Sequence, residues 1–126
     1  MSHIPMIQVS IVLPVYNGAK TLSNTLDSLV MQTYTDFEVI ACIDGSNDDS
    51  QRILEQYNSK FKQLTVLKNE VNRGLGPTMN RLIYYTKGEY IAVAEQDDYY
   101  YPERLQLQVA ILNKNQSIGL VSGIAE

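Results

Sequence analysis

The chain alternates between short apolar runs and longer segments with helical signals, and this alternation constrains its fold more than any other feature. The runs 9–14, 37–43, 64–67, 90–94 and 119–124 are rich in β-branched side chains, as buried strands are. The segments 21–32, about 46–61, 77–87 and 102–115 carry helical periodicity or helix-starting residues. Apolar strands that alternate with helices predict the α/β class, with a mostly parallel sheet and helices on both faces.

Polar loops follow the predicted strands. They read Pro-Val-Tyr-Asn-Gly at 14–18, Asp-Gly-Ser-Asn-Asp at 44–48, Asn-Glu-Val-Asn-Arg-Gly at 69–74 and Glu-Gln-Asp-Asp at 95–98. Because the carboxyl ends of parallel strands meet at one edge of a sheet, we expect these loops to converge there. Open α/β sheets bind ligands outside this edge, so the sequence predicts a binding site made by the four loops.

Three acidic residues, Glu95, Asp97 and Asp98, stand within the last of these loops. Carboxylates packed together without a neighbouring cation destabilise a fold unless something positive joins them. Divalent cations such as Mn²⁺ or Mg²⁺ prefer carboxylate oxygens and substrate phosphates. One interpretation of the acidic loop is therefore a metal-binding site for a phosphate-bearing ligand. The other is a solvated turn, in which Asp98 caps the helix that begins near Pro102.

Composition argues against several other functions. The net charge is -4 at a sequence pI of about 4.9, without a basic stripe, which disfavours a nucleic-acid-binding module. A single cysteine, Cys42, and a single histidine, His3, leave no internal disulfide and no zinc cluster. No apolar run reaches the roughly 20 residues of a membrane-spanning helix, and no secretory signal is evident. We expect one cytoplasmic domain over 7–126, with a flexible lead-in over 1–6.

Several motifs resemble those of the family 2 glycosyltransferases, a large family with the GT-A fold. The stretch "VSIVLPVYNGAKTLSNTLDSLVMQTYTDFEVIACIDGSNDDS" contains that family's P-x-Y-N turn, its Q-T-x-x-D-F-E-V-I link and its D-G-S-x-D turn. The segment 72–74 matches its N-x-G loop, and 95–102 matches its D-x-D-D-x-x-x-P stretch. These matches follow in order over nearly the whole chain. They imply the nucleotide-binding part of a GT-A domain, truncated before its acceptor half.

The resemblance also implies a role for each matching residue. Asp97 would ligate a Mn²⁺ or Mg²⁺ ion that bridges the donor diphosphate, and Asp44 would accept a hydrogen bond from the base, which suggests uridine. Glu95 stands where the family usually has the first Asp of D-x-D, and Ile43 where it often has a second Asp. The residues expected to contact the nucleotide are Pro14, Val15, Tyr16, Asn17, Asp44, Asn72, Arg73, Gly74, Glu95 and Gln96.

What the resemblance implies for activity is the inverting transfer of a sugar from a nucleotide-sugar, here expected to be a UDP-sugar, to a glycan or lipid-linked acceptor. Family members supply the acceptor site and the general base from a second half, so we expect no catalytic base among the 126 residues. We also expect action at the inner face of the membrane. An apolar surface left exposed where the second half would pack would favour dimerisation.

Two other functions stay open at the level of the sequence. A nucleotidyltransferase also holds a metal on acidic strand ends, and it releases pyrophosphate rather than a nucleoside diphosphate. It would need a Gly-rich basic loop after the first strand, and the segment 18–20 (Gly-Ala-Lys) matches such a loop only weakly. The other alternative is a non-catalytic nucleotide-binding module.

Overall fold

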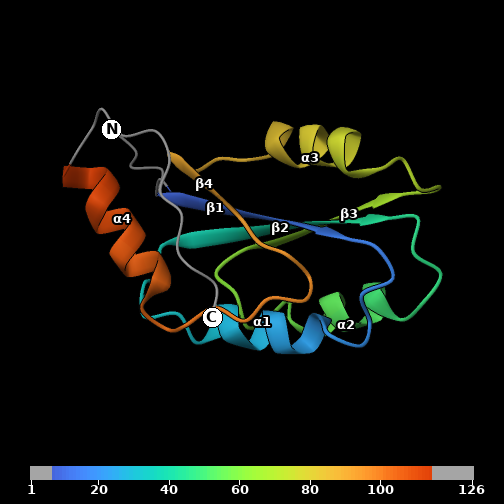
Figure 1. Cartoon of the computed structure of the whole chain (residues 1–126), viewed down its shortest axis with the longest axis horizontal. Coiled ribbons are helices and arrows are strands. Elements are labelled where there is room, and N and C mark those ends of the chain that lie inside the picture. The colour runs from blue at the N-terminus through green and yellow to red at the C-terminus, as the bar shows by residue number, and fades with distance from the viewer. Residues whose placement is uncertain (1–6, 115–126) are drawn as a thin grey trace.

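The computed structural model describes residues 7–114, which form a four-stranded sheet with helices on both faces (Figure 1). The strands are β1 (Val9–Val15), β2 (Phe37–Asp44), β3 (Leu64–Asn69) and β4 (Tyr90–Val93). The helices are α1 (Leu22–Val30), α2 (Ser50–Gln56), α3 (Leu75–Tyr84) and α4 (Arg104–Lys114). The strand order is β3-β2-β1-β4, and each neighbouring pair is parallel. The predicted α/β class and parallel sheet are thus confirmed.

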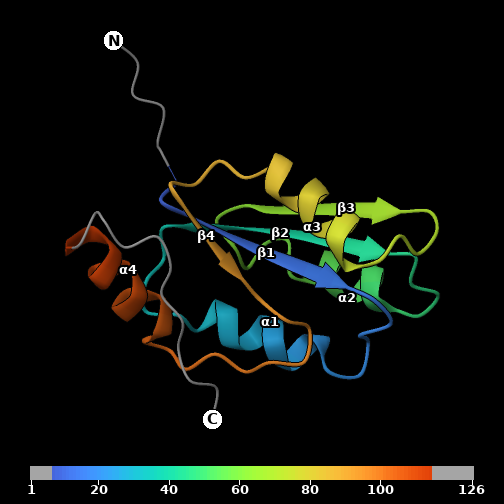
Figure 2. The same cartoon turned by 45° about the horizontal axis from the view of Figure 1, so that its top comes forward.

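Different helices bury the two faces of the sheet. Alternate residues of β1 and β2, such as Ile11 and Val39, pack with α1, α2 and α4 in the larger core. The residues between them, such as Val12 and Ile40, pack against Leu82 of α3 in a smaller core. Figures 1 and 2 show α3 on one side of the sheet and the other three helices on the opposite side. Because both faces are covered, the two central strands are apolar almost throughout.

The ends of some elements differ from the sequence-based expectation. Helix α2 ends at Gln56 rather than near residue 61, although Tyr57 and Phe61 stay buried and stack at a ring-centroid distance of 6.3 Å. Helix α3 begins before Pro77 and ends at Tyr84 instead of Lys87. The predicted strand 119–124 and the lead-in 1–6 lie outside the described residues. Among the helices of residues 7–114, none could span a lipid bilayer.

Buried polar contacts tie the start of β4 to the sheet. Ser10 Oγ donates to Glu38 Oε2 (2.6 Å). The main-chain N–H of Lys87 donates to the same Glu38 oxygen (2.8 Å), and the N–H of Gly88 donates to Ser10 Oγ (2.8 Å). A Cβ at Gly88 would lie 2.6 Å from the main-chain N of Ser10, so the close approach requires glycine. These contacts fix where β4 begins and therefore where the acidic turn that follows it lies.

Candidate functional site

A cavity of about 350 Å³ opens at the carboxyl edge of the sheet, where β1, β2 and β4 end and α3 begins. The loops that follow these strands converge there, as a parallel sheet requires. Most of the lining consists of residues singled out from the sequence, and two residues of α3 that the sequence did not suggest complete it. The lining residues are Pro14, Val15, Tyr16, Asp44, Asn72, Gly74, Leu75, Thr78, Glu95, Gln96 and Asp97.

Asp44, the last residue of β2, is buried and holds the loop that follows β3. Its Oδ1 accepts hydrogen bonds from the main-chain N–H of Arg73 (2.7 Å) and from Asn69 Nδ2 (2.9 Å), and its Oδ2 accepts one from the N–H of Gly74 (2.9 Å). Burial raises the pKa of Asp44, but the hydrogen bonds together outweigh it, so the pKa lies below its ordinary value. The carboxylate is therefore charged at neutral pH.

Two glycines allow this loop to lie against the end of β2. Gly45 has a φ of 72° and Gly74 a φ of 90°, a region that residues with side chains rarely adopt. A Cβ at Gly45 would collide with the main-chain N of Asn72. The D-G-S turn therefore permits the close approach of the Asn72 loop, which forms part of the cavity wall.

Two hydrogen bonds between Gln96 and Tyr16 fix another part of the wall. Gln96 Oε1 accepts from the N–H of Tyr16 (2.8 Å), and Gln96 Nε2 donates to the Tyr16 carbonyl (2.9 Å). Gly18 leaves room for the amide, because a Cβ there would lie 2.5 Å from Gln96 Oε1. The Gln96 side chain thus joins the loop after β1 to the loop after β4, a structural role that the sequence did not reveal.

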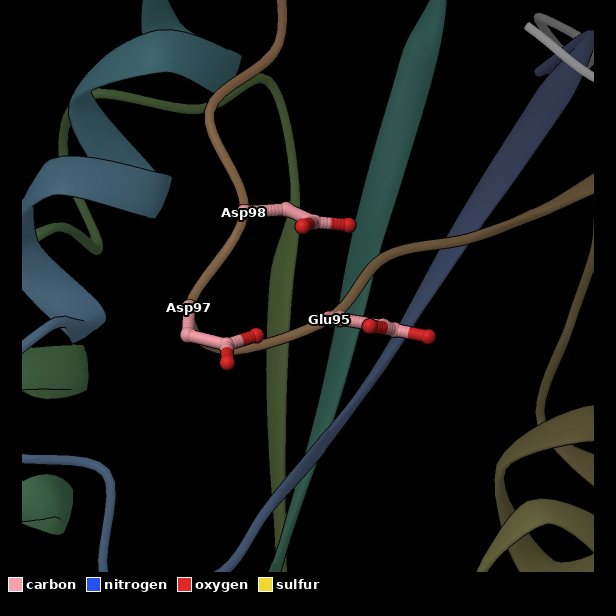
Figure 3. Close-up of side chains that lie close together, drawn as sticks. All are labelled: Glu95, Asp97 and Asp98. Atoms are coloured by element: carbon pink, nitrogen blue, oxygen red, sulfur yellow. The ribbon is translucent and has the colours of Figure 1, made fainter. Parts of the chain in front are cut away.

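Glu95, Asp97 and Asp98 form a carboxylate cluster in the turn after β4 (Figure 3). One carboxylate oxygen of each lies within 4.8 Å of the others, and all three side chains extend to the same side of the turn. Within 7–114 both ion pairs of the structure lie elsewhere, so no described ion pair neutralises the cluster. Three hard oxygen donors at this spacing fit Mn²⁺ or Mg²⁺. The longer Glu95, in place of the usual Asp, still reaches the cluster.

Tyr100 is the buried member of the run of three tyrosines, and it supports the acidic turn. Its side chain packs in the larger core, and its hydroxyl accepts a hydrogen bond from the N–H of Glu95 (2.9 Å). The same hydroxyl lies 3.3 Å from Asp98 Oδ2, to which it donates. Burial is the main reason that the pKa of Tyr100 rises to about 12, with a further contribution from the charge of Asp98.

Two residues that the sequence assigned to the nucleotide do not line the cavity. Asn17 instead joins two loops, because its N–H donates to Ser46 Oγ (2.9 Å) and its Oδ1 accepts from the N–H of Asn47 (3.1 Å). Arg73 lines a separate pocket of about 370 Å³ together with Arg81 of α3. Its main chain, through the hydrogen bond to the β2 carboxylate, still shapes the cavity.

A parallel sheet that carries a cavity and a carboxylate cluster at its carboxyl edge defines an α/β protein with its ligand site at the strand ends. Comparison with known proteins identifies the family. Residues 10–125 match the sequence profile of Glycosyl transferase family 2. The chain belongs to this family, and its fold is the GT-A fold.

Curated relatives agree with this assignment. The chain is 33% identical over 115 residues to putative glycosyltransferase EpsE of Bacillus subtilis (strain 168), a match that covers 90% of this chain and 41% of EpsE. It is 41% identical over 123 residues to poly(ribitol-phosphate) beta-glucosyltransferase of Bacillus spizizenii, covering 93% and 19%. The chain therefore spans less than half the length of these relatives.

The similarity extends to solved structures. A crystal structure of S. aureus TarS 1-349 in complex with UDP superposes with a TM-score of 0.82 at 31% identity, covering 86% of this chain and 33% of TarS 1-349. A structure of the same protein in complex with UDP-GlcNAc also has a TM-score of 0.82. The fold of this chain is thus shared with a protein that was solved in complex with UDP and with UDP-GlcNAc.

Proposed function

We propose that this chain is the nucleotide-sugar-binding part of a glycosyltransferase whose donor is a UDP-sugar. The observation that carries the proposal is a single cavity whose lining includes both the Asp44 carboxylate and the acidic turn after β4. A UDP-sugar has matching chemistry, with an N–H donor on the base and a diphosphate that needs a cation. The TarS complexes with UDP and UDP-GlcNAc support the choice of nucleotide.

The base end of the cavity lies between Tyr16 and Asp44. The Tyr16 side chain is 48% exposed, so its ring is available to pack against a base. Asp44 lines this end of the cavity, and a carboxylate offers about four lone-pair sites, so it would accept a base N–H beside the hydrogen bonds that it already receives from the loop. Pro14 and Asn72 complete this end of the lining.

The diphosphate end lies at the acidic turn. Asp97, with Glu95 and Asp98, would hold Mn²⁺ or Mg²⁺, and the ion would neutralise charge on the departing diphosphate. Glu95 and Gln96 lie beside the ribose and the metal in this arrangement. Because both residues line the cavity together with Asp97, one bound donor can contact all three.

The sugar would move with inversion to a hydroxyl of a glycan or lipid-linked acceptor. The names of two relatives include poly(ribitol-phosphate) and alpha-D-GlcNAc-diphosphoundecaprenol, so phosphate-bearing acceptors occur in the family. A lipid-linked acceptor would place the reaction at the inner face of the membrane. We assign no general base among the described residues, because the acids that line the cavity belong to its nucleotide side.

Calorimetric titration tests the proposal directly. UDP is titrated into the chain with Mn²⁺, then with EDTA, and the series is repeated with Asp97→Ala. We expect binding that Mn²⁺ strengthens and that the substitution weakens by at least tenfold, because the loss of one hard ligand removes much of the attraction between protein, ion and diphosphate. Glu55→Ala is the matched control, since Glu55 is an exposed acid of α2 that does not line the cavity.

Each outcome has a definite meaning. Equal UDP affinity in Mn²⁺ and EDTA would eliminate the metal role but keep the nucleotide site. Binding of neither UDP nor UDP-GlcNAc under any condition would eliminate the proposed donor site. Release of pyrophosphate rather than UDP from a nucleotide-sugar would favour a nucleotidyltransferase. Ile91 and Val93 lie exposed on β4, the edge strand of the sheet that residues 7–114 form, and they would favour self-association, which sedimentation at several concentrations measures.

A further inference from the structure

Helix α1 carries a line of polar side chains that the apolar face of the helix does not explain. Thr21, Thr25, Ser28 and Gln32 follow one another at intervals of roughly one helical turn, on and just beyond α1. All except Thr21 are buried, and Thr25 is 0% exposed. Buried hydroxyl and amide groups need hydrogen-bond partners. Ser28 Oγ donates to the Thr25 carbonyl within the helix (2.6 Å), whereas the other three side chains have partners in the segment that follows β4.

The target of the first two hydroxyls is the main chain on either side of Asp97. Thr21 Oγ1 and Thr25 Oγ1 lie 3.0 Å and 2.9 Å from the Gln96 carbonyl. Thr25 Oγ1 also lies 2.6 Å from the Asp98 carbonyl, so its single proton is shared between two acceptors. The acidic turn is therefore attached to α1 immediately before and immediately after Asp97.

Gln32 continues this attachment along the chain. Its Nε2 donates to the Tyr101 carbonyl (2.8 Å), and its Oε1 accepts from the N–H of Leu105 at the start of α4 (3.1 Å). Figures 1 and 2 show the segment between β4 and α4 running along α1. One face of α1 thus holds the whole connection that carries the acidic cluster.

The bonds of the turn are made by its main chain, whereas its carboxylates stay available. Among the hydrogen bonds of the described residues, none involves a carboxylate oxygen of Glu95 or Asp97, and Asp98 receives only the long bond from Tyr100. Three carboxylates that cluster without a cation repel one another. The hydroxyls of α1 therefore oppose the tendency of the turn to spread.

We propose that Thr25 is a positioning residue that holds the acidic turn at the spacing a divalent cation needs, so that its hydroxyl sets how strongly the cation supports diphosphate binding. The inference rests on the proposed function. Thr25 does not line the cavity, and it acts through the main chain of Gln96 and Asp98. A preorganised set of ligands binds more tightly because less ordering is needed when the ligand arrives.

The test compares Thr25→Val, which removes the hydroxyl, with Thr25→Ser, which keeps it. The readout is the ratio of UDP affinity in Mn²⁺ to UDP affinity in EDTA, measured by calorimetry. We expect Thr25→Val to lower this ratio by roughly three- to tenfold, the equivalent of one buried hydrogen bond, with UDP affinity in EDTA unchanged. Thr25→Ser should restore most of the ratio. Equal losses in both variants would overturn the proposal, since the methyl group would then be responsible.

A second measurement separates a failure of this inference from a failure of the proposed function. Amide hydrogen exchange of the segment 95–99, without metal or nucleotide, should be faster in Thr25→Val than in the wild type and Thr25→Ser. Unchanged exchange in a folded Thr25→Val would overturn the positioning role whatever the chain binds. Faster exchange in a chain that binds no UDP would keep the role of Thr25 in holding the turn, but it would refute the proposed donor site and with it the link to the cation. If Thr25→Val does not fold, the exposed Thr21→Val should show a smaller effect in the same direction.

Discussion

Replacement of Asp44 by alanine should destabilise the protein even without any ligand. The carboxylate accepts hydrogen bonds from Asn69 Nδ2 and from the N–H groups of Arg73 and Gly74. Bonds to a charged group are worth about 1.5–3 kcal/mol each. Arg73 is exposed, so water can replace part of the lost hydrogen bonding once the carboxylate is gone. The free energy lost is therefore smaller than the sum of the individual bonds. We expect a loss of about 3 kcal/mol, a large part of the stability of a typical domain.

Urea unfolding followed by far-ultraviolet circular dichroism measures this loss. With a typical urea slope of about 1–3 kcal/mol/M, a loss of about 3 kcal/mol corresponds to a midpoint lower by roughly 1–3 M. The control is Asp97→Ala, which removes an exposed carboxylate and should change stability by no more than about 0.5 kcal/mol. A loss below about 1 kcal/mol for Asp44→Ala, or an equal loss for both variants, would refute the reasoning from hydrogen bonds.

The pH dependence gives an independent check of the same residue. The hydrogen bonds hold the pKa of Asp44 below its ordinary value of 3.8, despite its burial. A carboxyl group with a lowered folded-state pKa contributes stability that is fully present above its unfolded-state pKa and is lost as the pH falls through the folded-state value. The gap between wild type and Asp44→Ala should therefore be constant from about pH 5 to 8 and shrink below about pH 4. A gap that widens on acidification would contradict this sign.

Three further predictions concern other parts of the site. Gly45→Ala should lower the free energy of unfolding in urea by about 3 kcal/mol or more, because φ is 72° and the new Cβ would meet the main chain of Asn72. Stability close to that of the wild type would show that the loop can move away. Gly18→Ala should displace the Gln96 amide, lower the free energy of unfolding by about 1–2 kcal/mol and weaken UDP binding in calorimetry. Unchanged UDP affinity would mean that the pairing of Gln96 with Tyr16 is not needed for binding. In an ultraviolet pH titration of the nine tyrosines, the component near pH 12 should vanish in Tyr100→Phe. Because the folded-state pKa is raised, wild-type stability should fall between about pH 10 and 12, and a flat profile would contradict the assignment.

Local patterns in the sequence were sufficient to predict the parallel sheet and the family. Runs such as 37–43 are apolar at nearly every position, which only a strand covered on both faces requires, and the order of strands and helices then predicts a parallel sheet. Motifs of fixed spacing, such as D-G-S-x-D and the acidic turn, carried the resemblance to family 2 glycosyltransferases, and the profile match over 10–125 confirms it. The hydrogen-bond partners of the side chains, in contrast, could not be predicted from the sequence. Gln96 lines the cavity, but its amide also pairs with Tyr16, which the sequence did not reveal, and Asn17 and Arg73 do not line the cavity.

What the sequence determined by itself is therefore the class of fold, the family and the edge of the sheet where polar residues gather, because each depends on periodicity or on motifs within a short stretch of chain. The tertiary structure decided which polar atoms are already used. The Thr25 hydroxyl and the Asp98 carbonyl are 73 positions apart, and Asp44 is 29 positions from the N–H of Arg73 that it accepts. Such pairs leave no local signal, since a buried threonine on a helix looks the same whatever it contacts. Only packing of the helix against the sheet brings these atoms together, and it thereby leaves the carboxylates of the acidic turn available for a ligand.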